Sequence, residues 1–361
     1  MRATGPSVVI IGAGIIGASA AYALQKAGAR VTIVDAGGET ATASSFGWIN
    51  ASFHHDAAHF RLREEGLAAW KRLGSKLDLP VSWRGTLCWE ETGEALTAQH
   101  DQLCALGYAV REIDQAEFTS LEPHIAEPPV RALHFAAEAS VDSIVATNAL
   151  LDAAASLGAQ RLRGLKVEEI METKGRFAGI RTQAGITLAD HVLIAAGTGT
   201  AALMTQAGVP MSMLRRPALV LRTRPVPPVL RHVLVSQFGE LRQLGDGTLL
   251  MPAAVDHQGD SSETVTDSLE DTADQVLIRL RSLLPHLTLD WQELTLAFRP
   301  VPQDELPVIG AVAKGLHVAC MHSGITLGAL AGELVAQEML EGVTNQSGAL
   351  LAAYRPSRFA K

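Results

Sequence analysis

The sequence predicts an α/β fold, and three observations lead to that prediction. Residues 8–11 form a short apolar run, VVII, which is typical of a strand buried in a parallel sheet. A segment of small residues runs from there to Gly28, and a second strand, residues 30–34, ends on Asp35. Near the far end of the chain, residues 316–321 again form a strand that leads into a glycine-bearing helix start. The first of these units is typical of a Rossmann-type sheet.

Three glycines between the first strand and the first helix stand in G-x-G-x-x-G spacing. Gly12 permits a tight turn, Gly14 lets a pyrophosphate approach the backbone, and Gly17 lets helix and strand pack closely. The helix N-terminus that follows, at Ile15 and Ile16, offers free N–H groups and a partial positive charge to phosphates. The spacing therefore predicts a phosphate-binding turn.

Asp35 and the adjacent Ala36 mark the other end of this predicted site. The Asp35 carboxylate can accept hydrogen bonds from both ribose hydroxyls of an adenosine, whereas a 2′-phosphate would be repelled as a like charge. The unit thus predicts an ADP-containing dinucleotide and disfavours NADP. Because segment 7–25 carries no charge, a membrane-spanning helix or an export signal is an alternative interpretation. Its glycines and the strand that follows argue against both.

The composition excludes several other classes of protein. The chain has 361 residues, is 47% apolar, and carries a net charge of −8 without a basic tract, which argues against a nucleic-acid partner. This length accommodates two domains with their own cores. Cys88, Cys104 and Cys320 show no metal-ligand spacing, and their odd number argues against a disulfide framework. We therefore expect a cytoplasmic protein with no metal and no transmembrane segment.

A stretch rich in Gly, Ser and Thr, residues 37–55, follows Asp35 and predicts an extended loop beside the first strands. Ser44 and Ser45 are placed to donate hydrogen bonds to phosphate, and Gly47 and Trp48 to lie near a ring system. A solvated loop with one buried tryptophan is the alternative.

The next part of the chain is expected to alternate helices and strands. In the helix at 57–77, Arg61, Arg63, Glu64 and Glu65 are expected to form a solvated face. Later elements are strands at 81–89, near 109 and at 131–136, and helices at 94–106, 116–121 and 144–157, with Asp142 or Ser143 as N-cap of the last.

From residue 160 onward, strands dominate. They are expected at 161–165, 167–173, 176–182, 187–194, 215–224 and 289–298, with a hairpin turn at Asp246-Gly247 and a helix at 267–284. The strand at 187–194 closes on a turn containing Ala196 and Gly197, where backbone can approach a ligand.

The last section contains a second helix start. Residues 299–310, RPVPQDELPVIG, are expected to form a rigid, proline-punctuated loop, and a helix then runs from Gly324 to about Leu340, with Gly342 as its C-cap. A flavin dinucleotide gains from one helix dipole at its pyrophosphate and from another facing its ring, where reduction creates negative charge. A nicotinamide dehydrogenase usually completes its binding unit with further βαβ repeats directly after the first. We therefore expect FAD.

With both ends in view, the sequence resembles the family of D-amino acid oxidase, glycine oxidase and sarcosine oxidase, which are FAD-dependent oxidoreductases. The similarity covers nearly the whole chain and is carried by residues 8–35, 44–45, 193–197, 298–310 and 322–340. The resemblance implies a discontinuous Rossmann-type FAD-binding domain and an α+β substrate domain whose mixed antiparallel sheet covers the flavin. The ranges are 1–80, 141–214 and 297–361 for the first domain, and 81–140 and 215–296 for the second.

The resemblance also assigns residues to the cofactor. Those expected to hold FAD are Gly12, Gly14, Ile15, Ile16, Gly17, Asp35, Ala36, Ser44, Ser45, Gly47, Trp48, Val167, Ala196, Gly197, Gly310, Ser323, Gly324, Ile325, Thr326 and Leu327. Relatives that tether flavin covalently use a cysteine just before their Pro-Asp loop. Phe298 and its neighbours offer none, so FAD is expected to be non-covalent.

Substrate contacts are expected from a few side chains. Arg299 stands where relatives place the arginine that binds the substrate carboxylate, a role that suits its two parallel donors; a loop-bracing salt bridge is the alternative. His54, His55 and His322 lie near the expected flavin loops and are candidates for touching substrate. Some members carry a second arginine at the start of the last helix, where this chain has HSGIT.

The implied reaction transfers a hydride from the α-carbon of a small amino acid (a D-amino acid, glycine or an N-alkyl amino acid) to flavin N5, giving an imine and then a keto acid. The electron acceptor is oxygen, a quinone or another protein. No lysine lies between Lys174 and Lys314, where sarcosine oxidase-like members use one near the flavin, which favours a dehydrogenase. The alternatives are a 2-hydroxy acid dehydrogenase and a flavin subunit of a multi-subunit amino acid or opine-type dehydrogenase, inactive alone. A homo-oligomer and a hetero-complex both stay open.

Overall fold

The computed structural model describes residues 5–255 and 262–359. The first of its two bodies of structure is built on a six-stranded sheet in the order β19-β20-β13-β1-β2-β9. The strands are β1 (Ser7–Ile11), β2 (Arg30–Asp35), β9 (Gln160–Arg163), β13 (His191–Ile194), β20 (Leu316–Cys320) and β19 (Val308–Ala313). All neighbours are parallel except the β19–β20 pair. The predicted Rossmann-type sheet is confirmed.

Alternating side chains cover the two faces of this sheet differently. Ile10 and Ile33 point into a core shared with the helices α1 (Ile15–Lys26), α5 (Ser143–Ser156) and α8 (Gly324–Glu341). Val9 and Ile194 point to the other face, where the three-stranded sheet of β10 (Val167–Thr173), β11 (Arg176–Thr182) and β12 (Gly185–Leu188) lies with α6 (Thr200–Gln206). Because β1 is buried on both faces, residues 8–11 form a continuous apolar run and do not alternate with polar residues.

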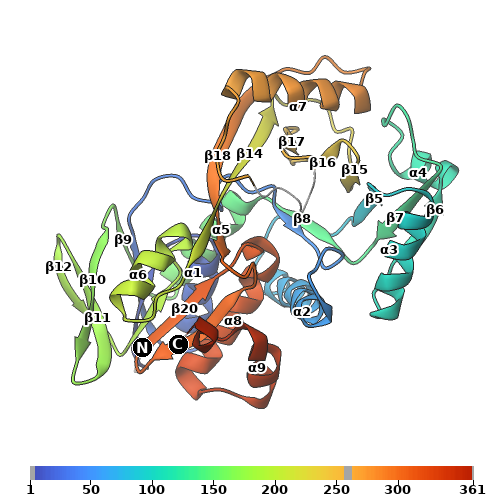
Figure 1. Cartoon of the computed structure of the whole chain (residues 1–361). Helices are drawn as coiled ribbons and strands as arrows, with labels where there is room; N and C mark the ends of the chain where they lie inside the picture. Colours follow the sequence, from blue (N-terminus) through green and yellow to red (C-terminus); the bar gives the residue numbers. More distant parts are fainter. Residues whose placement is uncertain (1–4, 256–261, 360–361) are drawn as a thin grey trace.

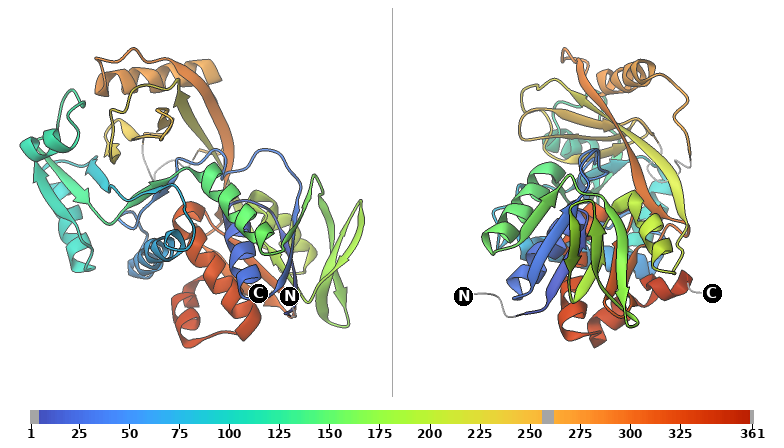
Figure 2. Two further views of the ribbon diagram at one scale, coloured as in Figure 1. Left: turned by 180° about the vertical axis from the view of Figure 1, so that it is seen from behind. Right: turned by 90° about the vertical axis from the view of Figure 1, so that its left-hand side faces the viewer.

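An eight-stranded sheet in the order β18-β14-β17-β16-β15-β5-β7-β6 forms the second body of structure (Figure 1). Its strands are β5 (Thr86–Trp89), β6 (Arg111–Asp114), β7 (Arg131–Phe135), β14 (Met213–Thr223), β15 (Val233–Ser236), β16 (Gly239–Gln243), β17 (Leu249–Pro252) and β18 (Trp291–Pro302). Only β5 and β15 pair in parallel, so the sheet is mixed and mainly antiparallel, as predicted. Helix α7 (Leu269–Leu283) packs on it, while α8 and the six-stranded sheet lie beyond its opposite side (Figure 2).

The prediction of a loop at 299–310 is wrong. Arg299 to Pro302 finish β18, Val308 begins β19, and only five residues connect the two strands. Pro300 and Pro302 are compatible with this strand because β18 is the edge of its sheet, with a single neighbour, β14. An edge position tolerates prolines because one side of the strand needs no hydrogen-bond donor. Arg299 therefore projects from a strand.

Two predicted strands are divided in the structure. The segment 81–89 splits into β4 (Val81–Ser82) and β5, and the segment 187–194 splits into β12 and β13, each half joining a different sheet. β4 joins β8 (Ala139–Val141) and β3 (Trp48–Ile49) in a small sheet. The remaining helices are α2 (Ala57–Gly74), α3 (Gly93–Ala105), α4 (Gln115–Leu121) and α9 (Asn345–Leu350).

Two local predictions are confirmed. Asp142 caps α5 by accepting hydrogen bonds from the Ile144 and Val145 amides. Gly342 ends α8 with φ +86°. Among the described residues, no helix is long and apolar enough to cross a membrane. The domain ranges stay a prediction.

Candidate functional site

The glycine-rich turn has the geometry that its spacing predicts. Gly12 adopts φ +108°, and its N–H donates to the Val34 carbonyl at 2.8 Å. A Cβ at Gly12 would overlap the Ala195 carbonyl oxygen, and a Cβ at Gly17 would overlap the Gly12 carbonyl oxygen. The turn is therefore closed against both its helix and the neighbouring strand, which only glycine permits at these two positions.

The N-terminus of α1 faces a threonine that sequence reasoning missed. The Ile15 N–H donates to Thr42 Oγ1 at 3.2 Å, and the same hydroxyl is the neighbour that a Cβ at Gly14 would meet at 3.1 Å. The first turn of α1 contains no acidic residue, and Gly14 supplies no side-chain cap. These features fit a pyrophosphate at this helix end, with Thr42 beside it.

Asp35 lies at the end of β2, where the ribose of an adenosine was expected. Its Oδ1 accepts from the Gly37 N–H at 3.0 Å, and its Oδ2 pairs with Arg161 of β9 at 2.6 Å. A carboxylate has about four acceptor sites, so ribose hydroxyls remain compatible with both contacts. The Arg161 charge does weaken the repulsion of a 2′-phosphate, so Asp35 discriminates against NADP less than the sequence suggested.

The two helix starts at opposite ends of the chain meet in space. A Cβ at Gly324, the first residue of α8, would lie 3.8 Å from the Ile16 side chain and 3.9 Å from that of Ile15. Gly324 follows Ser323, which gives α8 no side-chain cap. Two positive helix ends thus converge on one region, the arrangement expected for FAD.

A cavity of about 490 Å³ lies between this region and the eight-stranded sheet. Ten of the predicted site residues line this cavity. They are Ser44, Ser45, Gly47, Trp48, His55, Arg299, His322, Ser323, Ile325 and Thr326. Gly310 is absent from this lining and instead packs against Arg355, with φ +132°. His54 also lies outside it: its ring contacts the Ala51 carbonyl at 3.2 Å and packs edge-on against Phe60. Its catalytic role is not supported by this geometry.

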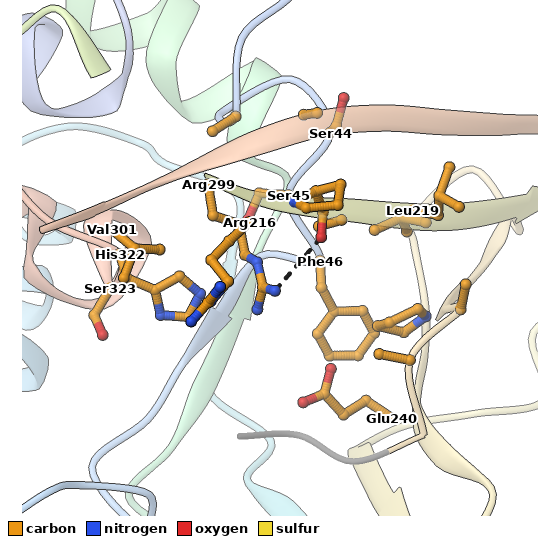
Figure 3. A pocket seen from close by; sticks show the side chains of 18 of the residues that line it. Ser44, Ser45, Phe46, Arg216, Leu219, Glu240, Arg299, Val301, His322 and Ser323 are labelled. Carbon is orange, nitrogen blue, oxygen red and sulfur yellow. Dashed lines mark hydrogen bonds between the residues drawn. The ribbon is translucent and has the colours of Figure 1, made fainter. Parts of the chain in front are cut away.

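Two arginines lie side by side in the roof of the cavity. Arg299 of β18 is the register partner of Arg216 of β14, and both line the cavity. Figure 3 shows them gathered with His322. Arg216 also approaches the Glu263 carboxylate at 3.7 Å, and an Arg299 Nη donates to the Pro217 carbonyl at 3.4 Å. Two neighbouring guanidiniums favour binding of a carboxylate.

A third arginine, Arg63, comes from the face of α2 that was expected to be solvated, so that prediction is wrong for this residue, while Arg61 is exposed. Its side chain is buried, donates to the Asn50 carbonyl at 3.0 Å and to Ser323 Oγ at 2.6 Å, and also contacts Asn50 Oδ1. Among the described residues, no carboxylate forms an ion pair with it. Desolvation lowers the pKa of Arg63 to about 10, so the side chain stays charged at neutral pH. It adds positive charge beside the start of α8.

The loop at 46–52 is held by two buried charged groups. Glu138 accepts hydrogen bonds from Trp48 Nε1, the Ala51 and Ser52 amides and the Tyr108 hydroxyl, all at 3.0–3.2 Å. Arg242 of β16 donates to the Val141 carbonyl at 3.0 Å and to the Phe46 carbonyl. The loop is therefore tied to the eight-stranded sheet through Arg242 and to the segment between β7 and β8 through Glu138, which fixes its position in the cavity wall.

Two histidines in the cavity wall are held in the neutral form. Although the His322 side chain is exposed to the cavity, the protein atoms around it desolvate the ring, and the charges of Arg299 and Arg63 add to this effect, so its pKa is lowered. Desolvation and the Arg63 charge also lower the pKa of His59 to about 3. A neutral imidazole can accept a hydrogen bond from a ligand, but a strongly lowered pKa makes it a weak base.

Burial of neutral His59 makes stability depend on pH. Below pH 6.5 the unfolded chain takes up a proton that the folded His59, with a pKa of about 3, does not. We therefore expect the free energy of unfolding to fall as the pH is lowered, by about 2 kcal/mol from this group between pH 7.5 and 5. Urea unfolding at both pH values checks this, and His59→Gln should reduce the loss. Equal losses in the wild type and the variant would contradict it.

Comparison with known proteins agrees with this geometry. Residues 7–338 match the family model described as "DAO: FAD dependent oxidoreductase". The chain is 26% identical to the bifunctional protein ThiO/ThiG of Trichormus variabilis, over 98% of this chain but 55% of that one, so it spans about half the length of this relative. It is also 26% identical to hydrogen cyanide synthase subunit HcnC of Pseudomonas aeruginosa and to glycine oxidase of Geobacillus kaustophilus, over 91% of both chains in each case.

The fold agrees as well. The crystal structure of glycine oxidase from Geobacillus kaustophilus superimposes with a TM-score of 0.84, over 98% of this chain and 99% of that one, at 24% identity. Because the family model covers nearly the whole chain, the resemblance noted in the sequence is confirmed. The protein belongs to the DAO family of FAD-dependent oxidoreductases.

Proposed function

We propose that this oxidoreductase oxidises an amino acid at its α-carbon while Arg299 binds the substrate carboxylate. The observation that carries the proposal is the pair of guanidiniums, Arg299 and Arg216, in the roof of a cavity whose floor contains the start of α8. Two parallel hydrogen bonds from one guanidinium fix a carboxylate in position and orientation. A substrate held in this way has its α-carbon oriented toward the floor of the cavity.

The residues present fit FAD, which when bound accepts the hydride. The closed turn at Gly12 and Gly17 and the Ile15 amide would hold its pyrophosphate, Asp35 its ribose, and Ser323 and Gly324 its ring. Positive charge from Arg63 and from the N-terminus of α8 stabilises negative charge in this part of the cavity. FAD is proposed to be non-covalent. Burial raises the pKa of the Cys320 thiol to about 12, which leaves it unreactive.

A 2-hydroxy acid is the second candidate substrate, because His322 lines the cavity, although its lowered pKa makes it a weak base. Removing a proton from an alcohol requires a positioned base, whereas a neutral amine requires none. We expect His322→Ala to slow reduction by a hydroxy acid about a hundredfold or more and to change reduction by an amino acid little. If His322→Ala slows flavin reduction by both substrates equally, the hydroxy acid is not supported as the substrate.

The proposed function is tested by anaerobic mixing of the purified yellow protein with a panel of compounds. The panel contains D- and L-amino acids, glycine, N-methyl amino acids, proline and 2-hydroxy acids, and bleaching of the flavin absorbance is recorded. We expect bleaching by at least one α-amino acid. If no compound of the panel bleaches the flavin, the proposal that this chain alone oxidises an amino acid is wrong.

A role as a flavin subunit of a larger enzyme also stays open, since one relative is named a synthase subunit. Bleaching that appears only with co-purified partner chains would support that role. Bleaching by the isolated chain would exclude a requirement for partners in this step.

A further inference from the structure

Two buried hydrogen-bond donors in the cavity wall have no acceptor within the part of the chain that the structure describes. Asn50 is 2% exposed and His59 is 3% exposed, and both line the cavity. The atoms without a partner are Asn50 Nδ2 and His59 Nε2. Leaving a buried donor unsatisfied costs about 1–3 kcal/mol. Two such donors in one cavity therefore call for a ligand that supplies acceptors.

The other polar atoms of these two side chains fix both free atoms as donors. Asn50 Oδ1 accepts from the Arg63 guanidinium and from the Thr326 hydroxyl at 3.3 Å, so the group left over is the NH2. His59 Nδ1 accepts from the His55 N–H at 3.2 Å. Because the pKa of His59 is about 3, its ring is neutral, and its single proton lies on Nε2. The cavity is thus offered two N–H donors in fixed positions.

The face of α2 that carries His59 runs along the start of α8. Four residues share this face because they are three or four positions apart: His59, Arg63, Gly66 and Trp70. Trp70 Nε1 donates to the Ile325 carbonyl at 2.8 Å. Arg63 donates at 2.6 Å to Ser323 Oγ, one residue before α8 begins. His59 lies one helical turn beyond Arg63 and lines the cavity, so it borders the space in front of the α8 N-terminus.

Asn50 is fixed to the same helix start. Its N–H donates to the Thr326 hydroxyl at 3.3 Å, and Arg63 Nε donates to its carbonyl at 3.0 Å. The two donors therefore border the floor of the cavity, whereas Arg299 and Arg216 lie in its roof. A flavin ring carries carbonyl oxygens and ring nitrogens, which are the acceptors that Asn50 and His59 lack.

We infer that Asn50 Nδ2 and His59 Nε2 donate hydrogen bonds to acceptor atoms of the flavin ring and hold it at the start of α8. This inference rests on the part of the proposed function in which Ser323 and Gly324 hold the ring. Hydrogen bonds strengthen when the acceptor becomes negatively charged, as the ring does on reduction. The two donors therefore also raise the reduction potential of the bound cofactor.

FAD and ADP form a matched pair of ligands for testing this inference, because ADP has the adenosine and pyrophosphate but no ring. Release of FAD from the holoenzyme, followed by flavin fluorescence with and without ADP as competitor, gives both dissociation constants. We expect His59→Leu to weaken FAD about tenfold and ADP less than about twofold. His59→Gln, whose side-chain NH2 replaces the Nε2–H donor, should stay within about threefold of the wild type. The control is His317→Leu, a buried histidine of β20 outside the cavity lining, which should change neither constant.

A second variant tests the other donor and carries the experiment if His59→Leu does not fold. Asn50→Asp keeps the oxygen that faces Arg63 and replaces the donor with a second acceptor, so FAD should weaken at least tenfold while ADP is unchanged. In His59→Leu, the reduced cofactor should lose about tenfold more affinity than the oxidised one. Equilibration with a redox dye would then show a potential about 30 mV lower for this two-electron couple.

The outcomes separate a contact with the ring from a merely structural role. Equal losses for FAD and ADP overturn the inference, because the side chains then only support the fold. Unchanged FAD affinity in both variants overturns it as well, and a potential that does not fall removes the effect on reduction. No oxidisable compound is present in these measurements. Weaker FAD binding with ADP unchanged thus supports the inference even if no substrate bleaches the flavin and the proposed oxidation fails.

Discussion

Replacing Arg299 with leucine is expected to raise the half-saturating concentration of a carboxylate-bearing substrate about 10- to 100-fold. The change removes hydrogen bonds to a charged group, each worth about 1.5–3 kcal/mol, while the neighbouring Arg216 retains part of the attraction. Because carboxylate binding is made before as well as during the reaction, the limiting rate of flavin bleaching should change less than the half-saturating concentration. Anaerobic stopped-flow mixing over a range of substrate concentrations measures both quantities.

A matched control for this variant is Arg224→Leu. Arg224 lies just beyond β14 and pairs with Asp290 at 3.0 Å on the exposed side of the molecule, outside the cavity. It should leave both quantities as in the wild type. An unchanged half-saturating concentration in Arg299→Leu would remove the carboxylate-anchor role and leave Arg299 as a brace between β14 and β18.

Replacing Gly17 with alanine is expected to destabilise the protein and to release FAD. Gly17 lies in α1, and a methyl group there would overlap the Gly12 carbonyl oxygen, so the helix must move away from the turn. Overpacking of this kind costs about 1–3 kcal/mol, and the displaced helix end no longer presents its amides to a pyrophosphate. The ratio of flavin to protein absorbance and the thermal unfolding midpoint report the two effects.

The matched control for Gly17→Ala is Gly74→Ala. Gly74 is also helical, at the end of α2, but a Cβ there meets no atom within 4 Å among the described residues. The substitution should be neutral or should stabilise the protein by up to about 1 kcal/mol, because glycine is a poor helix former. Normal flavin content and stability in Gly17→Ala would show that the turn tolerates a side chain there.

The parts of the fold that local patterns specify could be predicted from the sequence. The turn at Gly12, the Asp142 cap and the hairpin at Asp246-Gly247, closed by the Leu244 N–H to the Thr248 carbonyl at 2.8 Å, each depend on a few consecutive residues. The glycines proposed to hold the FAD pyrophosphate belong to this group because their spacing has a direct physical reason.

The cavity wall could not be predicted because distant contacts decide it. Arg63 lies among charged neighbours on a helix, and its burial depends on Ser323, which is 260 residues away along the chain. The strand at Arg299 depends on β18 being a sheet edge, and the inward position of Arg216 depends on strand register. A shift of one residue would turn this side chain away, and nothing local fixes it.

The hydrogen bonds of Glu138 have a consequence for the path that a ligand takes. This fully buried carboxylate joins the 48–52 loop to Tyr108, and separating them would leave a desolvated acceptor with few donors. That side of the cavity therefore stays shut during turnover. Another part of the cavity lining is formed by Thr264, Val265, Thr266 and Asp267, which are exposed. Ligands are expected to arrive and leave across this exposed part of the lining, so substitutions there should change association and dissociation rates more than affinity.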